Sequence, residues 1–159
     1  MASRHTNGPR ATYIGKIQAP CERVFDGLTT PGDLRRWFTR EARIDLRTGG
    51  SWRLSFDEDI HVSGTFVSVH RPDEIVMKWN EWWEDAAGAA GADQDTSVTS
   101  TSVMRLIEVE GTTRLEIEQF GYPDTLPWRM FADELQDGWE VEIAKLRAWL
   151  ERGVASRGA

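Results

Sequence analysis

The feature that most constrains the fold is an apolar stripe in the last part of the chain. Apolar side chains recur there every three to four residues over about six helical turns, at Trp128, Phe131, Leu135, Trp139, Ile143, Leu146 and Leu150. Such a helix must bury its apolar face against a second layer. Thr125 or Asp124 can cap its start, and Gly153 marks its expected end. The sequence therefore predicts one long, amphipathic C-terminal helix.

The second layer is predicted from alternating apolar and polar residues, which are typical of strands with one buried face. Strands are expected at residues 12–19, 42–46, 52–56, 61–70, 75–83, 96–109 and 113–120. Two short helices come after the first strand, one from Pro20 to Leu28 and one from Asp33 onward. This order predicts an α+β fold in which a curved antiparallel sheet wraps around the long C-terminal helix. A cavity is expected between sheet and helix.

The domain organisation is simple, because 159 residues suit one domain of ordinary size. We expect a disordered leader at residues 1–10, a single domain at 11–152 and a flexible tail at 153–159. Residues 85–95 are small and polar without periodicity, and they predict a mobile hairpin loop.

Charge and cysteine content exclude several classes of function. A net charge of −7 argues against a nucleic-acid-binding surface, which needs a basic face. No apolar run approaches the roughly 18 residues of a membrane span. Cys21 has no second cysteine to pair with, and residues 1–10 lack the apolar core of a secretion signal. We therefore expect a cytoplasmic protein.

Short signatures in this order carry a resemblance to a known family. They lie at Ala19–Phe25, Leu34–Phe38, Asp45–Trp52, Gly64–Phe66, Arg71–Trp79, Gly111–Leu115 and Gly138–Trp139. From Tyr13 to Glu151 the chain resembles the helix-grip (START-like, SRPBCC) superfamily of lipid-binding and polyketide-cyclase-like domains. Within it, the chain is similar to the family named for the activator of the ninety-kilodalton heat-shock protein's ATPase (AHSA-like), and a bacterial member is expected.

The resemblance implies a helix-grip fold with a pocket, but it does not imply a reaction, because binders, cyclases and chaperone regulators share this fold. We expect a single domain, without the additional N-terminal domain of the eukaryotic activators. ATPase activation is therefore not expected to carry over, and a chaperone partner is an alternative without support from the residues.

Aromatic residues are the leading candidates for a ligand site, since rigid apolar rings suit the wall of a cavity. The predicted ligand-binding residues are Trp37, Phe38, Trp52, Phe66, Met77, Trp79, Met104, Gln119, Trp128, Phe131, Leu135 and Trp139. The alternative is that these side chains simply fill the core, because protein interiors pack densely.

Three polar residues share inward strand faces with apolar neighbours. Gln119 lies on the face of Leu115 and Ile117, and Ser100 and Ser102 lie on the face of Met104. Buried polar groups need partners, so these could anchor a polar group of a ligand. Hydrogen bonds to neighbouring side chains or water are the favoured alternative.

Catalytic and metal sites are not favoured by the sequence. Cys21 lies near a helix start, where the helix dipole can lower a thiol pKa, but no histidine is near it in sequence. His61 with Asp57–Asp59 matches no recognised metal-ligand spacing, and a solvated turn is the preferred interpretation. No catalytic residue, metal or cofactor is therefore predicted.

The leading hypothesis is a non-enzymatic protein that binds a small apolar or aromatic molecule between sheet and helix. The alternatives are a polyketide cyclase or aromatase-like enzyme, and a protein that sequesters a toxic natural product or binds a chaperone. Tryptophans within residues 80–84 could form a lid, a partner patch, or a surface that the second chain of a homodimer covers.

Overall fold

One curved antiparallel sheet and a long helix form the framework of the chain. The computed structural model describes residues 8–81 and 98–158. Along the chain its elements are β1 (Ala11–Ile17), α1 (Cys21–Thr29), α2 (Pro31–Trp37), β2 (Glu41–Ile44), β3 (Ser51–Ser55), β4 (His61–His70), β5 (Glu74–Glu81), β6 (Val98–Val109), β7 (Thr112–Phe120) and α4 (Leu126–Gly158). The predicted order of a strand, two short helices, further strands and a long helix is confirmed.

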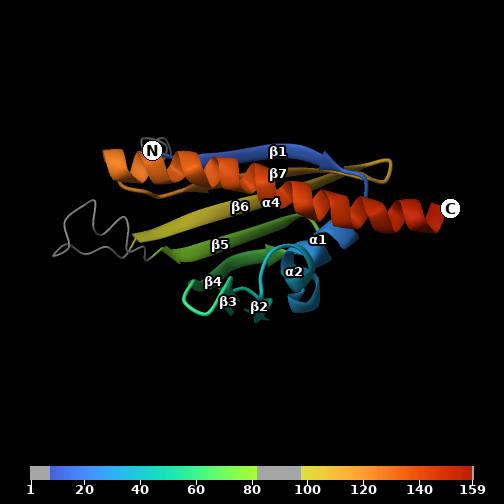
Figure 1. Cartoon of the computed structure of the whole chain (residues 1–159), viewed down its shortest axis with the longest axis horizontal. Helices are drawn as coiled ribbons and strands as arrows, with labels where there is room; N and C mark the ends of the chain where they lie inside the picture. Colours follow the sequence, from blue (N-terminus) through green and yellow to red (C-terminus); the bar gives the residue numbers. More distant parts are fainter. Residues whose placement is uncertain (1–7, 82–97, 159) are drawn as a thin grey trace.

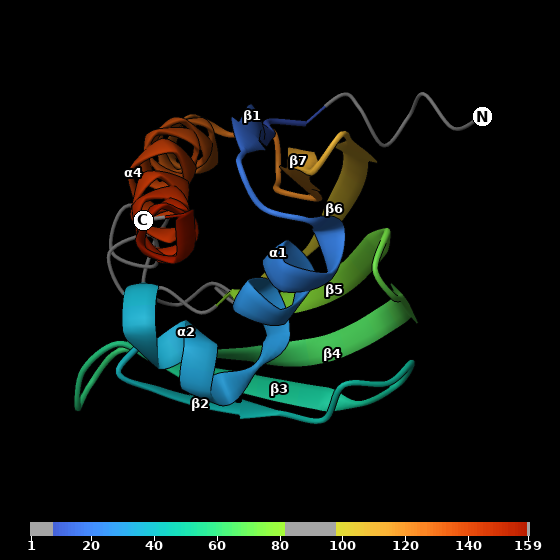
Figure 2. The same cartoon turned by 90° about the vertical axis from the view of Figure 1, so that its right-hand side faces the viewer.

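The described strands form a single sheet in the order β1-β7-β6-β5-β4-β3-β2, and every neighbouring pair is antiparallel. Figure 1 shows α4 running along the β1–β7 side of this sheet. Seen from the end of α4, the sheet curves from β1 around to β2, and the helices occupy its hollow side (Figure 2). The predicted helix-grip arrangement is confirmed.

The strand bounds differ from expectation mainly at β2, which ends at Ile44 and does not reach Leu46. The chain turns there, because the amides of Arg47 and Gly50 donate to the carbonyls of Asp45 and Arg47. Gly49 adopts a φ of +82°, which favours glycine. The strand therefore ends in a turn, although apolar residues continue to alternate as far as Leu46.

Gly64 on β4 does not lie at the bulge of this strand, although an isolated glycine in a strand often marks one. The register shift lies between Phe66 and Ser68 instead. A Cβ at position 64 would lie 1.8 Å from the Lys78 carbonyl oxygen and 2.7 Å from the Trp52 ring. Gly64 therefore permits a close approach between neighbouring strands and the Trp52 ring.

The two short helices close one end of the hollow. Val24 and Phe25 of α1 and Leu34 of α2 are buried in the main core. Helix α2 begins at Pro31, two residues before the predicted start, since a proline is well suited to the first turn. Phe38 follows directly after this helix and points its ring toward the core by stacking on Trp37, at 4.8 Å between ring centroids.

Most of the apolar stripe of α4 is buried, as the sequence predicts, whereas Phe131 and Leu135 are half-buried. Trp139, Ile143, Leu146 and Leu150 join the main core, while Trp128 packs in a second cluster with Tyr122 and Ala132. The predicted end at Gly153 is wrong, because α4 continues to Gly158. One glycine lowers helix propensity by only about 1 kcal/mol, which is too little to end a helix without a further stop signal.

Some sequence-based expectations fall outside the described residues. The predicted mobile loop at 85–95, the tryptophans at 82 and 83, and most of the predicted leader at 1–10 belong to this group. Within residues 8–81 and 98–158, no helix combines the length and apolar character that crossing a membrane requires.

Candidate ligand cavity

A cavity of about 230 Å³ lies between the sheet and the N-terminal half of α4. Its walls come from α4, from the ends of β3 and β4, from β5 and β7, and from the segment after α2. The lining residues are Phe38, Phe56, Val62, Trp79, Gln119, Phe131, Leu135, Gly138, Trp139 and Glu142. The lining is therefore almost wholly apolar, with one amide and one carboxylate.

The two tryptophans of the wall are fixed in orientation by hydrogen bonds to the sheet. Nε1 of Trp79 donates to Oγ of Ser102 at 2.8 Å, and Nε1 of Trp139 donates to Oε1 of Gln119 at 3.1 Å. Their rings lie edge to face, with 6.3 Å between centroids and 89° between planes. Because their N–H groups are satisfied within the protein, the rings offer apolar surface to the cavity.

Phe38, which follows α2, extends this wall. Its ring contacts Phe56 edge to face at 5.1 Å and lies 6.2 Å from the Trp139 ring. Aromatic rings held by several neighbours lose little entropy when a ligand binds, so the wall is preorganised for an apolar guest.

The inward polar residues Ser100, Ser102 and Gln119 bond to one another and to tryptophans. Gln119 Nε2 donates to Ser100 Oγ at 3.1 Å, which adds to the bonds from the two indoles. These contacts agree with the alternative that the sequence favoured, in which the polar side chains form hydrogen bonds with their neighbours. Gln119 still lines the cavity and can present its amide to a ligand.

Glu142 supplies the one carboxylate among the described residues of the cavity wall. Its Oε1 is buried and lies 2.6 Å from Nζ of Lys145, one turn further along α4. Lys145 thus forms an ion pair with this carboxylate. Because a carboxylate has two acceptor oxygens, a ligand with an N–H or O–H group could also donate to it at the cavity wall.

The predicted ligand-binding residues divide into three groups. Six of them line the cavity: Phe38, Trp79, Gln119, Phe131, Leu135 and Trp139. Four others, Trp37, Phe66, Met77 and Met104, surround a neighbouring space of only about 20 Å³, room for about one water molecule. The remaining two line neither space, since Trp52 packs edge to face on Trp79 and Trp128 stacks on Tyr122.

Sequence reasoning missed Phe56, Val62, Gly138 and Glu142 as cavity residues. Phe56 and Val62 flank the acidic turn after β3, where alternation ends and a side-chain direction is hard to assign. Gly138 and Glu142 follow Leu135 at helical spacing, so the helical pattern already placed both near the apolar face. A Cβ at Gly138 would meet no atom within 4 Å, because the cavity begins there.

Cys21 is not an activated thiol. Burial raises its pKa, outweighing the opposing effect of a hydrogen bond with Thr113. The alternative of a pKa lowered by the helix dipole is therefore wrong. A thiol kept protonated in this way is a poor nucleophile.

The turn with His61 and Asp57–Asp59 is occupied by local hydrogen bonds. Oδ1 of Asp57 accepts from the amides of Asp59 and Ile60, and Nδ1 of His61 lies 3.0 Å from Ser55 Oγ. In the part of the chain that the structure describes, no three His, Cys, Asp or Glu residues are grouped to hold a metal ion.

The fold and this cavity define a helix-grip protein. A family model described as "Activator of Hsp90 ATPase homolog 1-like protein" matches residues 18–151, so the chain belongs to this family. No match was found among functionally curated proteins.

Several solved structures share the fold at low sequence identity. Protein MLL2253 from Mesorhizobium loti is 21% identical, with a TM-score of 0.73 over 89% of this chain and 97% of that one. An HSP90 activator from Plasmodium falciparum, PFC0360w, is 23% identical, with a TM-score of 0.69 over 91% and 97% of the two chains. CalU16 from Micromonospora echinospora is 23% identical, with a TM-score of 0.64 over 86% and 73%.

Proposed function

We propose that this chain binds one small, mostly apolar molecule in the cavity of about 230 Å³ and does not transform it. The observation that carries the proposal is an apolar cavity with preorganised aromatic walls, next to a core that is otherwise closed. A cavity of about 150 Å³ is known to accept benzene. The space between sheet and α4 therefore suits a single substituted aromatic ring or a small bicyclic ring system.

The polar groups of the wall favour a ligand that carries one hydrogen-bond donor. Glu142 and Gln119 are its polar lining residues, and a carboxylate accepts hydrogen bonds without donating any. Indole and phenol combine an aromatic ring with one N–H or O–H group, so they represent this class well.

Affinity should be modest, because a ligand of this size buries little surface. An aromatic ring buries roughly 150–250 Å². At about 25 cal/mol per Å² this area contributes roughly 4–6 kcal/mol. The corresponding dissociation constants lie between about 1 mM and tens of micromolar.

Calorimetric titration with indole tests the proposal, and Gly138→Leu is the decisive variant. A leucine side chain at position 138 would enter the cavity, since nothing else lies within 4 Å of a Cβ there. Asp137→Leu is the matched control, because it adds the same side chain at the neighbouring exposed position of α4. We expect the wild type and Asp137→Leu to bind indole and Gly138→Leu to lose binding.

Two further experiments test the hydrogen bond to Glu142 and the absence of a chemical reaction separately. Naphthalene, which lacks a donor, should bind more weakly than indole, and Glu142→Leu, which removes the acceptor, should remove most of that difference. Recovered indole should be chemically unchanged, whereas a product would favour the enzyme alternative. Equal indole binding by the wild type and Gly138→Leu, or no binding by either, would contradict the proposal.

A further inference from the structure

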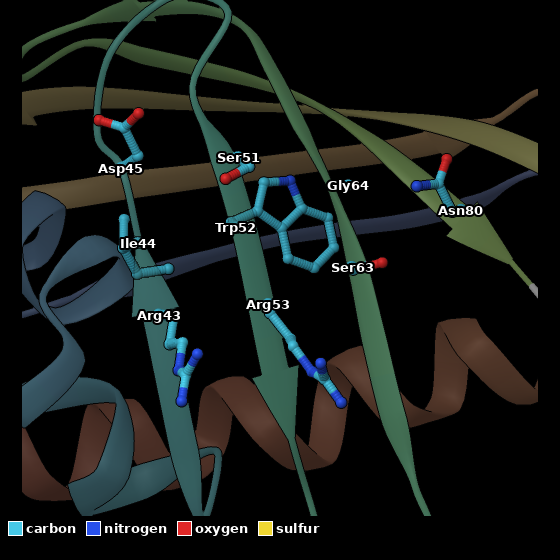
Figure 3. A pocket seen from close by; sticks show the side chains of 9 residues that line it. All are labelled: Arg43, Ile44, Asp45, Ser51, Trp52, Arg53, Ser63, Gly64 and Asn80. Atoms are coloured by element: carbon cyan, nitrogen blue, oxygen red, sulfur yellow. The ribbon is translucent and has the colours of Figure 1, made fainter.

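Two arginines lie side by side on the outer face of the sheet, away from the ligand cavity. Arg43 on the edge strand β2 is directly opposite Arg53 on β3 in the antiparallel register. Both residues are exposed, and their side chains extend in the same direction from neighbouring strands (Figure 3). Like charges directly opposite each other destabilise a strand pair.

Neither arginine is paired with an acidic residue in the part of the chain that the structure describes. Among the described residues, no carboxylate lies within ion-pair distance of either guanidinium. Glu41 on β2 and Asp45 just after it lie two residues to either side of Arg43; Asp45 is paired with Arg47, and Glu41 forms no ion pair with a described residue. The chain has a net charge of −7, so acidic side chains are plentiful elsewhere. The two arginines therefore conflict with the usual avoidance of like charges opposite each other on neighbouring strands. Such conflicts are typical of functional sites.

Polar donors continue the row across the sheet. In register, Arg53 is opposite Ser63 on β4, and Ser63 is opposite Asn80 on β5. With Ser51 and the Asp45 carboxylate, which is paired with Arg47, these side chains border an open hollow of about 510 Å³ (Figure 3). The two arginines also border a second hollow of about 280 Å³, which includes Glu41 and Ser55. The arginine pair thus forms the boundary between two open spaces.

We propose that Arg43 and Arg53, with Ser63 opposite Arg53 in register, bind the phosphate group of a small phosphomonoester. A phosphomonoester carries about −1.5 to −2 charges at pH 7 and three acceptor oxygens. Two guanidinium groups match that charge, and each offers a planar fork of donors suited to phosphate oxygens. The Ser63 hydroxyl supplies a donor for the remaining oxygen. The site goes beyond the proposed apolar-ligand function and does not depend on it.

Calorimetric titration with ethyl phosphate at low ionic strength tests the site. Its short chain is a poor probe of the aromatic cavity, and Gly138→Leu should bind it as the wild type does. Removing one of two charge-assisted contacts, in Arg43→Gln or Arg53→Gln, should weaken binding about tenfold or more. Arg36→Gln, at an exposed position on α2, is the matched control for loss of one charge and should leave binding unchanged.

Ethyl sulfate and inorganic phosphate identify what is recognised. Ethyl sulfate has one negative charge and should bind much more weakly than ethyl phosphate. Tighter binding of the ester than of inorganic phosphate identifies the ester as the ligand, and equal binding identifies the phosphate group alone. Equal affinity for ethyl sulfate, equal loss in Arg36→Gln, or no binding of ethyl phosphate by the wild type would each overturn the proposal.

Thermal unfolding distinguishes a binding role of the arginines from a structural one, because the two roles predict opposite changes in the unfolding temperature of the variants. Because each substitution relieves repulsion across β2 and β3, Arg43→Gln and Arg53→Gln should unfold at the same temperature as the wild type or higher. Loss of phosphate binding together with unchanged or increased stability supports a binding role. A marked decrease in unfolding temperature in both variants would show that the pair serves the fold and would overturn the assignment.

Discussion

Nε1 of Trp139 on α4 donates a hydrogen bond to Oε1 of Gln119 on β7, at 3.1 Å, and this contact joins the helix to the sheet at the cavity wall. Both side chains are buried. The same glutamine donates to Ser100, so one amide orients groups on three elements. A buried indole N–H thus has its partner, and the ring keeps its place in the cavity wall.

Replacing Gln119 with Leu should destabilise the protein by about 1–3 kcal/mol, because the Trp139 N–H then loses a buried acceptor. Urea denaturation measures the free energy of unfolding. In a Trp139→Phe background, which has no N–H at that point, the same replacement should cost clearly less. An equal cost in both backgrounds would show that the hydrogen bond is not the source of the effect.

Gly138→Ala should stabilise the protein by up to about 1 kcal/mol. Alanine favours the helical state relative to glycine, and the new Cβ meets no atom within 4 Å. Thermal denaturation measures the shift. A decrease in stability would mean that the helix backbone at this position is more restricted than its surroundings indicate.

Gly64→Ala should destabilise the protein by more than about 4 kcal/mol or prevent folding. The added Cβ would lie 1.8 Å from the Lys78 carbonyl oxygen, and backbone cannot move aside as a flexible side chain can. Gly32→Ala, on the short helix α2, is the control, because its Cβ would have open space. Folded yield and urea denaturation should separate the two variants, and similar behaviour would argue against the close strand contact.

Stability should fall as the pH rises above about 9. Burial raises the pKa of Cys21 above its ordinary 9.0, and burial also raises the pKa of Tyr13, although Arg147 opposes that shift. The unfolded chain therefore loses these protons first, so the stability present below the ordinary pKa values is lost at alkaline pH.

Urea denaturation across that pH range tests the expected fall. In Cys21→Ala the decrease should begin at higher pH, because only Tyr13 of this pair remains to ionise. A free energy of unfolding that stays constant or rises through the alkaline range would contradict the roles of both groups.

Much of the fold follows from periodicity within single elements. The stripe from Trp128 to Leu150 places one face of α4 in the core, and alternation places residues such as Trp52 and Met104 on the inner face of the sheet. These patterns depend only on the geometry of a helix or a strand, so they can be read along the chain. The end of α4 was predicted wrongly, because a single glycine competes with the favourable packing of a long helix.

The cavity and the arginine pair depend on distances between elements. Periodicity predicts that Met77 and Trp79 both point inward, but it does not show that Met77 borders only the space of about 20 Å³, whereas Trp79 also borders the cavity of about 230 Å³. The volume of each space is what remains when the volume of the side chains is subtracted from the volume enclosed by sheet and helices. Such a small remainder cannot be predicted from periodicity. Likewise, Arg43 and Arg53 become neighbours only through the register of β2 on β3, which long-range backbone hydrogen bonds establish. Local sequence therefore specifies the direction of each side chain, whereas the packing of distant segments specifies which side chains meet and where space is left between them.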